Sequence, residues 1–600
     1  MATKEAKIKF AIRRFKGFWQ QFRKSKRGLT GLLIIIFFAL IAIFAPFIAP
    51  YNDPIRPMDD VGIFTKYGPS IGRPIAVSLA VPAWYKYLPF IPKGQTNKTE
   101  RFYNAYITAY GQQWQLFGRE GENATSTLIE VTSRIAKLNT IIVTYPNGTE
   151  SAVSQNEYEF DPHNPKALRL LNLYPEGTKF DVQYVTGVDI VENIVLIRNP
   201  GFTSKDSLDE WQLYPAGSEM RFSETDGYYN DGCIEIKSLN LTQVELTKNF
   251  VYAYYEPPKK ILAHFAYKLI SNENATITFV LERDGSTNFT LYDFSLVPSD
   301  TYQSNVFDSL SETFKENVGS SYPLDYIFGN PSNFTLSLRV TLPSNSKLYL
   351  DNVAFIIYGN AFGILGTDNN PQLPRDIFSL LIYGSRVSLF IGVLSAIFST
   401  LIGLFVGLVA GYVGGVVDEG LMRFADLLLV MPTLPLFIVL VVALRAVGVF
   451  MSLWNLIIII TLFGWMSFSR TVRSMVLSLR ERAFVEAAKA SGAGTMHIIT
   501  RHILPNVFAL VYITLATSVP GAIVLEASLS WLGLGDPLIP SWGKILYDFN
   551  ASGLAVTKGV ADYWYWLFPA CIAIAVLAAA FILMGYAMDE ILNPRLRERR

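Results

Sequence analysis

Six runs of apolar residues, each close to the length that crosses a bilayer, limit what this 600-residue chain can fold into. A transmembrane helix needs about 20 predominantly apolar residues, because every backbone polar group in lipid must be satisfied within the chain. The runs cover residues 29–49, 387–412, 425–444, 453–468, 507–527 and 566–588. Only 17% of all residues are charged, which is too few for an average soluble chain. The sequence therefore predicts an α-helical polytopic membrane protein with six transmembrane helices.

Basic residues predict which side of the membrane each connecting segment occupies. Residues 1–28 carry ten Lys or Arg and a single acid, and the loop 470–505 and the tail 589–600 are also basic. Because Lys and Arg accumulate in cytoplasmic segments, we expect both termini and this loop in the cytoplasm. An even number of spans agrees with this and places residues 50–384 outside the cell. We expect a multi-pass protein of the cell membrane, with membrane lipid around its spans.

Acceptor sequences for N-glycosylation give a second test of this topology. The pattern Asn-x-Ser/Thr, with x not Pro, marks surface loops of exported segments. It occurs at Asn97, Asn123, Asn147, Asn240, Asn274, Asn288, Asn333 and Asn550. Every one lies in a segment that the charge rule places outside. A β domain rich in Thr and Asn would also produce the pattern by composition alone; if the sites are used, the large loop is extracellular.

The long segment between the first two runs has the pattern of β structure. Alternating runs such as "KFDVQYV", "ATITFVLE" and "LSLRVTL" are separated by turn sequences such as "NGT" and "RDGS", which is typical of β-sandwiches. We expect an inserted all-β extracellular region with a first β module over 50–196, closed by the hairpin-like "LYPEGTKFDVQYVTG". A second module over 197–360 and a linker over 361–386 follow. The ends of the second module, "IRNPGFTSKDSLDEWQLYP" and "SKLYLDNVAFIIYG", resemble jelly-roll domains of the carbohydrate-binding type.

The basic loop 470–505 interrupts the apolar half of the chain with helix-forming residues. In "RERAFVEAAKAS", alanines lie among strong helix formers, and Gly492 and Gly494 then break the helix. A second helical segment, "TMHIITRHI", follows, and Pro505 suits the first turn of the next span. These features predict a short cytoplasmic helix-turn-helix that lies across the membrane face and offers small side chains to a partner protein.

The sequence "EAAKASG", followed by "HILPN", resembles the EAA loop of the permease subunits of ABC importers. The matching positions are Glu486, Ala487, Ala488, Gly492, Ala493, His502, Leu504 and Pro505. The family usually has Ile where this chain has His502, although "RHILPN" is typical of the dipeptide/oligopeptide (nickel) branch. Further matches, including "EASLSWLGLGDPLIPSWGKIL", extend the resemblance over 15–54 and 364–600, and they are specific to the permease type with the longer N-terminus. The segment "LGTDNNPQLPRD", with Pro374 where Gly is usual, and the large inserted loop depart from the family.

The resemblance implies a permease core over 387–588 that serves an ATP-driven, binding-protein-dependent importer. The chain would form half of the translocation path, and its loop would be the coupling helix that seats in an ATP-binding subunit and pulls on spans three to five. The implied partners are a homologous permease subunit, two ATP-binding subunits and an extracellular substrate-binding protein. The chain contains no G-x-x-x-x-G-K-[ST] phosphate loop. We therefore expect ATP and Mg²⁺ on the partner subunits, no cofactor and no enzymatic activity on this chain, and no nucleic-acid partner.

The sequence does not identify the transported solute. The branch that the chain resembles handles di- and oligopeptides, and some relatives handle nickel or oligosaccharides. A different class of protein is the alternative: a membrane-anchored surface receptor whose β modules bind glycan. An anchor needs one span and has no use for an EAA loop, which favours the transporter.

Polar residues and prolines in the spans are further candidates for the substrate path or a gate. Asp426, at the inner start of the third span, and Glu526, at the outer end of the fifth, are candidates because carboxylates in a membrane are functional by default. Near the interfaces, snorkelling and capping favour a structural role instead. Pro432 and Pro435 are expected to bend the third span. The two cysteines and four histidines lack metal-ligand spacing, so we expect no metal site.

Overall fold

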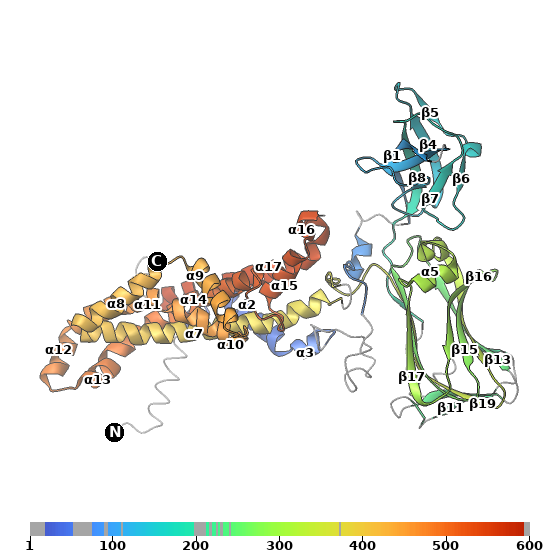
Figure 1. Cartoon of the computed structure of the whole chain (residues 1–600). Coiled ribbons are helices and arrows are strands. Elements are labelled where there is room, and N and C mark those ends of the chain that lie inside the picture. The colour runs from blue at the N-terminus through green and yellow to red at the C-terminus, as the bar shows by residue number, and fades with distance from the viewer. Residues whose placement is uncertain are drawn as a thin grey trace. The chain divides into compact units, whose positions relative to one another are not determined.

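The computed structural model divides into two compact units, one formed by residues 1–57 with 368–600 and one by residues 58–367 (Figure 1). The structure describes residues 19–51, 75–88, 94–109, 112–196, 212–214, 219–223, 226–227, 232–238, 242–370, 374–557 and 559–592. The first unit is helical, and the second consists mainly of strands. Because the helical unit takes segments from both sides of the second one, the strand-rich unit is a domain inserted into a loop.

Four helical stretches of the first unit are long and apolar enough to cross a membrane, and two bent helix pairs also qualify if each pair is one span. The four contain α2 (Lys26–Ile43), α7 (Ile377–Val413), α14 (Leu504–Trp531) and α17 (Trp564–Leu592). The pairs are α8 (Gly415–Val430) with α9 (Thr433–Ala446) and α10 (Leu453–Gly464) with α11 (Met466–Arg480). Short helices α3 (Ala45–Ile48), α15 (Trp542–Ala551) and α16 (Leu554–Thr557) lie between them along the chain. A helical multi-pass membrane unit with four to six candidate spans is therefore confirmed.

α7 begins at Ile377, well before the expected start at residue 387. The carboxylate of Asp376 accepts hydrogen bonds from the backbone N–H of Ser379 (2.8 Å) and from its hydroxyl (2.6 Å), which caps the helix. Polar residues such as Arg386 interrupt the apolar pattern in these first turns. The hydropathy pattern therefore missed them, and the end of the predicted linker 361–386 is helix.

The third predicted span, 425–444, is not one straight helix. α8 begins at Gly415, and the axis turns by 92° between the end of α8 and the start of α9. Pro432 precedes α9, and Pro435 lies in its first turn, where the missing N–H leaves no hydrogen bond unmade. The expected bend is present at Pro432, and Asp426 lies within α8 rather than at the start of a span.

Small residues on α7 allow close packing against α11 and α14. A Cβ atom at Gly407 would lie 2.6 Å from the carbonyl oxygen of Ser469, and one at Gly392 would lie 2.4 Å from the side chain of Ile523. Glycines let membrane helices approach this closely, which increases their van der Waals contact. α7 consequently holds α11 and α14 directly against its own backbone.

The first part of the strand-rich unit contains two antiparallel sheets around one hydrophobic core. The sheets have the strand orders β2-β1-β8-β4-β5 and β3-β7-β6. Their strands are β1 (Gln95–Ala109), β2 (Gln112–Arg119), β3 (Ile129–Glu130), β4 (Lys137–Thr144), β5 (Glu150–Ala152), β6 (Tyr158–Phe160), β7 (Ala167–Leu170) and β8 (Lys179–Gly187). Phe180 of one sheet and Leu168 of the other share the core. β7 pairs with β3 and β6, whereas β8 pairs with β1 and β4, so the hairpin expected at "LYPEGTKFDVQYVTG" is wrong.

The second part contains two larger antiparallel sheets, with the orders β10-β13-β18-β15-β16 and β11-β12-β19-β14-β17. Their strands are β10 (Gln212–Tyr214), β11 (Glu219–Ser223), β12 (Cys233–Ser238), β13 (Thr242–Tyr252), β14 (Lys260–Ile270), β15 (Ala275–Arg283), β16 (Thr287–Leu296), β17 (Ser299–Asp308), β18 (Ser332–Leu342) and β19 (Ser346–Tyr358). Phe279 of β15, Phe355 of β19 and Phe314 of α5 (Glu312–Val318) belong to one buried core. β9 (Ile194–Val195) pairs with β19, so this part takes a strand from before residue 197, where the sequence placed its start.

Candidate coupling site

The loop between α11 and α14 folds into two helical segments separated by glycines. α12 (Ala483–Ala490) is followed by Gly492 with φ of 77°, a left-handed conformation that glycine adopts without strain. α13 (Thr495–Ile498) is preceded by Gly494, and the π-helix η5 (Ile499–Ile503) leads into α14, which has Pro505 in its first turn. The predicted break at the glycines is confirmed. The second segment, however, continues into α14 instead of lying apart from it.

The outer surface of α12 is exposed. Val485 is its buried residue, whereas Glu486 and Ala487 are exposed. Phe484 exposes 44% of its surface, and Met496 of α13 exposes 72%. Figure 1 shows α12 and α13 together at one end of the helical unit. Exposed apolar side chains beside a carboxylate form a surface that a partner protein can cover.

Val485 connects this exposed surface to the membrane helices. It belongs to a buried cluster, here called the α12 cluster, that draws residues from α7, α11, the loop and α14. Its buried members are Leu404, Leu408, Phe468, Val472, Val476, Val485, Ile498, Ile503 and Val507, and Ala488, Ala493 and Leu504 pack against them. Because packed interiors transmit strain, a displacement of α12 displaces α7, α11 and α14. α7 and α14 contain the second and fifth predicted spans, whereas the resemblance implied spans three to five. α11 includes the end of the fourth predicted span, and residues 470–480, which were predicted to belong to the loop, are part of this helix.

His502 lies at the edge of the α12 cluster. It is half-buried, and its ring centre lies 6.3 Å from that of Phe484 and 6.0 Å from that of His497. The next residue, Ile503, is fully buried in the cluster. An imidazole at position 502 therefore meets other rings at the surface, and Ile503 supplies the apolar contact inside.

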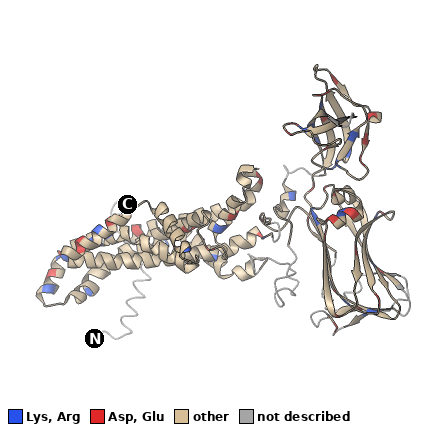
Figure 2. Cartoon of the chain, in the orientation of Figure 1, with Lys and Arg blue, Asp and Glu red and all other residues tan. Residues whose placement is uncertain are grey.

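The third predicted span joins this assembly through ion pairs. Arg473 of α11 bonds to Asp418 of α8, with Nη2 and Oδ2 2.6 Å apart, and Arg470 pairs with Asp426. Figure 2 shows charged residues gathered on α8, α11 and α12, and few in the middle of the helical unit. Asp426 therefore holds two helices together at the coupling end.

Glu526 of α14 is buried and is connected to two other elements, α7 and α15. Its surface is 1% exposed, and its carboxylate accepts hydrogen bonds from the hydroxyls of Ser530 (2.8 Å) and of Ser388 on α7 (3.3 Å). The Ser388 oxygen also accepts from the backbone N–H of Trp542, the first residue of α15 (3.2 Å). Glu526 does not reach solvent, so the snorkelling expected from its sequence position does not occur. Its contacts fix α15 against α7 and α14.

A buried ion-pair network, which sequence reasoning missed, also anchors α15. Arg375, just before α7, pairs with Asp368 (2.5 Å) and with Asp548 of α15 (2.8 Å), and Lys544 pairs with Asp548 as well. The side chains of Arg375 and Asp548 are 14% exposed, and that of Asp368 is 1% exposed. Arg375 and Asp548 are 173 positions apart in the sequence, which no local pattern relates. The one available signal was the unusual segment "LGTDNNPQLPRD", which contains Asp368 and Arg375.

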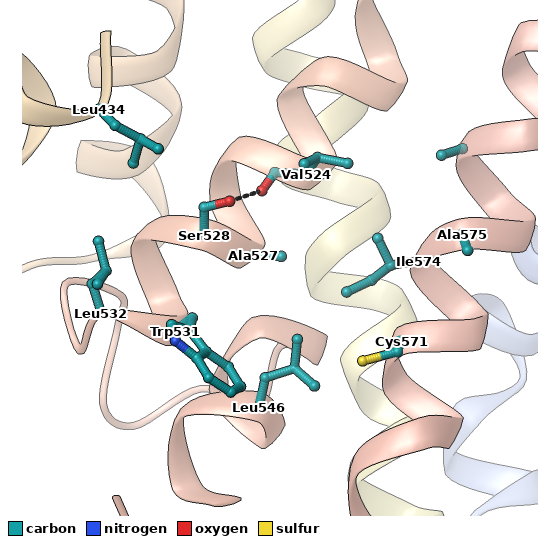
Figure 3. A pocket seen from close by; sticks show the side chains of 11 residues that line it. Leu434, Val524, Ala527, Ser528, Trp531, Leu532, Leu546, Cys571, Ile574 and Ala575 are labelled. Atoms are coloured by element: carbon teal, nitrogen blue, oxygen red, sulfur yellow. Dashed lines mark hydrogen bonds between the residues drawn. The ribbon is translucent and has the colours of Figure 1, made fainter. Parts of the chain in front are cut away.

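An apolar pocket of about 560 Å³ lies between α9, α14, α15 and α17 (Figure 3). Figure 3 shows Trp531 and Leu532 on one side and Cys571 and Ile574 on the other. The hydroxyl of Ser528 donates to the carbonyl oxygen of Val524 (2.8 Å) and is therefore not a free donor. The lining carries no charged side chain, so it offers no ion pair to a charged solute.

Seven of the eight predicted glycosylation sites fall within the described residues, and the asparagine of each is exposed. These are Asn97, Asn123, Asn147, Asn274, Asn288, Asn333 and Asn550. Asn240 lies outside the described residues. The exposed positions meet the requirement that a glycan acceptor lie on the surface.

The helical unit combines several candidate membrane spans with an exposed loop that one buried cluster attaches to three helices. Two family models match the sequence. The model for "Binding-protein-dependent transport system inner membrane component" matches residues 403–598, and that for "N-terminal TM domain of oligopeptide transport permease C" matches 14–60. Neither match includes the strand-rich unit.

Known relatives agree with these matches. The "Oligopeptide transport system permease protein OppC" of Bacillus subtilis (strain 168) is 38% identical over 236 residues, which are 39% of this chain and 72% of the relative. The "Dipeptide transport system permease protein DppC" of the same organism is 36% identical over 233 residues, 39% of this chain and 68% of the relative. A solved structure of the MetNI methionine ABC transporter is 20% identical, with a TM-score of 0.30, and covers 36% of this chain and 97% of that one.

The chain belongs to the family of binding-protein-dependent transport system inner membrane components. It is the permease subunit of an ABC importer, a transport component rather than an enzyme, and it works with ATPase and substrate-binding subunits. The resemblance seen in the EAA loop is thereby confirmed.

Proposed function

We propose that this permease imports di- or oligopeptides and forms one half of a translocation path whose other half is a homologous permease subunit. The names of the relatives, an oligopeptide and a dipeptide permease, support this solute class. Two ATP-binding subunits complete the importer and hold ATP and Mg²⁺, and this chain binds no cofactor. The observation that carries the mechanism is the α12 cluster, which connects an exposed loop to three spans.

α12 acts as the coupling helix. Glu486, Ala487 and Ala488 contact an ATP-binding subunit, together with exposed Phe484. Gly492 and Ala493 make the turn, and His502, Leu504 and Pro505 return the chain to α14. Closure of the ATPase pair moves α12, and the α12 cluster passes this movement to α7, α11 and α14. Access to the path then switches from one face of the membrane to the other.

The finer topology follows the charge pattern. We take each bent helix pair as one span, which gives six spans, cytoplasmic termini, a cytoplasmic α12 and an extracellular strand-rich unit. The exposed asparagines of that unit and Asn550 then face the surface where glycans are found. Asp426 and Glu526 act as positioning residues that hold helices together, and the break at Pro432 serves as a hinge beside the path.

The strand-rich unit gathers substrate or contacts the docked binding protein at the outer face. Its two pairs of sheets support a β-sandwich followed by a jelly-roll-like module, each with its own core. Residues 58–367 form one compact unit, so we expect this segment, expressed alone, to give a folded β spectrum by circular dichroism. A folded fragment that bound neither the binding protein nor oligosaccharides would leave only a shielding role.

Uptake by the reconstituted importer tests the proposed function. The permease, its homologous partner and the ATPases would be placed in liposomes with the binding protein outside, and labelled peptides and oligosaccharides would be compared. We expect ATP-dependent uptake of peptides that exceeds uptake of oligosaccharides. Preferred uptake of oligosaccharides would overturn the solute class. Glycan binding without any uptake would favour the receptor alternative.

A further inference from the structure

A second pocket, of about 660 Å³, lies where α9 ends, α10 begins and α15 passes by. It is lined by Arg445, the segment 448–452, the turn 533–538 and two residues of α15. Its volume falls in the range of about 300–1,000 Å³ that small-ligand sites occupy. Unlike the apolar pocket of Figure 3, it contains charged side chains together with apolar ones.

Arg445 provides an available cation in this pocket. Its Nη2 donates to the carbonyl oxygens of Gly533 (2.9 Å) and Gly535 (3.3 Å), which fixes one edge of the guanidinium. The residue is exposed, and no carboxylate among the described residues pairs with it. Its Nε and Nη1 N–H groups make no hydrogen bond with the described residues, and each can donate to a ligand carboxylate.

Asp536 provides the opposite charge. Its Oδ1 accepts from the backbone N–H of Leu538 (2.9 Å), and no Lys or Arg of the described part of the chain pairs with it. Lys544, the other cation in the lining, is already paired with Asp548. The pocket therefore holds one unpaired arginine and one unpaired aspartate that do not pair with each other.

The walls between these charges are apolar or lack side chains. Phe450 is 90% exposed and Leu538 is 73% exposed, and both line the pocket. Gly448 adopts φ of 83°, and no atom lies within 4 Å of where its Cβ would be. A ligand would thus find room for its own backbone and an apolar surface for a side chain.

We propose that this pocket binds a short zwitterionic peptide on its way into the translocation path, with the C-terminal carboxylate on Arg445 and the N-terminal ammonium on Asp536. The inference rests on the proposed function and extends it to a named subsite and to both ends of the substrate. A peptide with free termini carries one carboxylate and one ammonium group, which are the partners that an arginine and an aspartate bind, and the apolar walls accept its side chains. A neutral sugar would form no ion pair with either residue.

Uptake of terminally blocked peptides by the complete importer tests this assignment. Arg445→Gln should lower kcat/KM for a dipeptide with free termini by about tenfold to a hundredfold, the usual effect of losing a hydrogen bond to a charged group. The same variant should change uptake of the C-terminally amidated dipeptide less than about twofold. Asp536→Asn should likewise lower kcat/KM for the dipeptide with free termini, and it should change uptake of the N-acetylated dipeptide little. Each variant is compared with the wild-type importer for the same peptide and with the same binding protein. The binding protein's own preference for free termini therefore does not affect the comparison.

Arg386→Gln is the matched control, since Arg386 is an exposed arginine of α7 that does not line the pocket, and it should leave all uptake rates unchanged. Arg445→Lys, which keeps the charge, should restore part of the loss. Equal loss for free and amidated peptides, together with weaker docking of the binding protein, would show a protein-docking surface and overturn the subsite. Unchanged uptake in Arg445→Gln would overturn it as well. Failure of the wild-type importer to move any peptide would instead remove the proposed function itself.

Discussion

The polar residues at the two ends of the helical unit differ in their exposure to solvent and in their bonding. At the α12 end, Glu486 is exposed on a helix whose one buried residue, Val485, packs in the α12 cluster. At the α15 end, Glu526, Arg375 and Asp368 are buried and bonded to other parts of the chain. The first arrangement leaves polar groups available to a partner, and the second uses them to fix α15. Substitutions at the two ends should therefore separate effects on partner binding from effects on stability.

Arg375→Gln should have the largest effect on stability. Removing the guanidinium leaves Asp368 buried without its ion-pair partner, whereas Asp548 keeps Lys544. Breaking a buried ion pair in this way costs about 3–5 kcal/mol. We expect the purified permease to unfold at a clearly lower temperature, measured by thermal denaturation in detergent. Combining Arg375→Gln with Asp368→Asn should recover part of the loss, because Asp368 is the carboxylate that is left without a cation. An unfolding temperature equal to that of Arg386→Gln would show that the network contributes little.

Val485→Ala should have an intermediate effect on stability and a larger one on coupling. It removes two buried methyl groups from the α12 cluster, which costs about 2 kcal/mol. We expect the variant to bind the ATP-binding subunits normally but to hydrolyse more ATP for each solute molecule imported, measured in liposomes. Lys489→Ala, an exposed change on the same helix, is the control for stability. A normal ratio of hydrolysis to uptake in Val485→Ala would contradict a mechanical role for the cluster.

Glu486→Lys should leave stability within about 0.5 kcal/mol of wild type, as for most surface changes, and yet weaken association with the ATP-binding subunits. The expected result is loss of co-purified ATPase activity at an unchanged unfolding temperature. Glu312→Lys makes the same charge reversal on an exposed residue of the strand-rich unit and should not affect association. Full ATPase recovery with Glu486→Lys would show that this carboxylate is not part of the contact.

Labelling on intact cells should distinguish segments outside the cell from the cytoplasmic α12 end without any substitution. Glycan-removing enzymes should act on Asn147 and Asn333 in the strand-rich unit, whereas an impermeant amine reagent should reach Lys489 of α12 only after the membrane is opened. The readouts are a gel shift and mass spectrometry of the labelled peptide. Reaction of Lys489 on sealed cells would refute the six-span topology.

Local signals in the sequence account for much of the α12 end. The glycines after "EAAKAS" predicted where α12 stops, and Gly492 has the positive φ that favours glycine there. Pro505 was expected in the first turn of the next helix and lies there. These predictions concern neighbouring residues, whose conformations depend on backbone sterics and hydrogen bonds within a few positions. The alternation of polar and apolar residues likewise predicted a β-rich insertion, for the same local reason.

The structure of the α15 end depends on contacts between distant segments, which no local sequence pattern predicts. Hydropathy showed apolar runs, but it did not show that Arg375 meets Asp548, that Glu526 meets Ser388, or that β8 pairs with β1 instead of forming a hairpin. By itself, the sequence determined the membrane class, the glycine-broken loop and the family, because these rest on composition, short-range conformation and motifs. Only the tertiary structure decided which charges are paired and which, such as exposed Arg445 and partly buried Asp536, have no ion-pair partner among the described residues. Ion pairing depends on which distant segments pack together. A charge inside the protein is stable only where a group of opposite charge or a hydrogen-bond partner lies beside it.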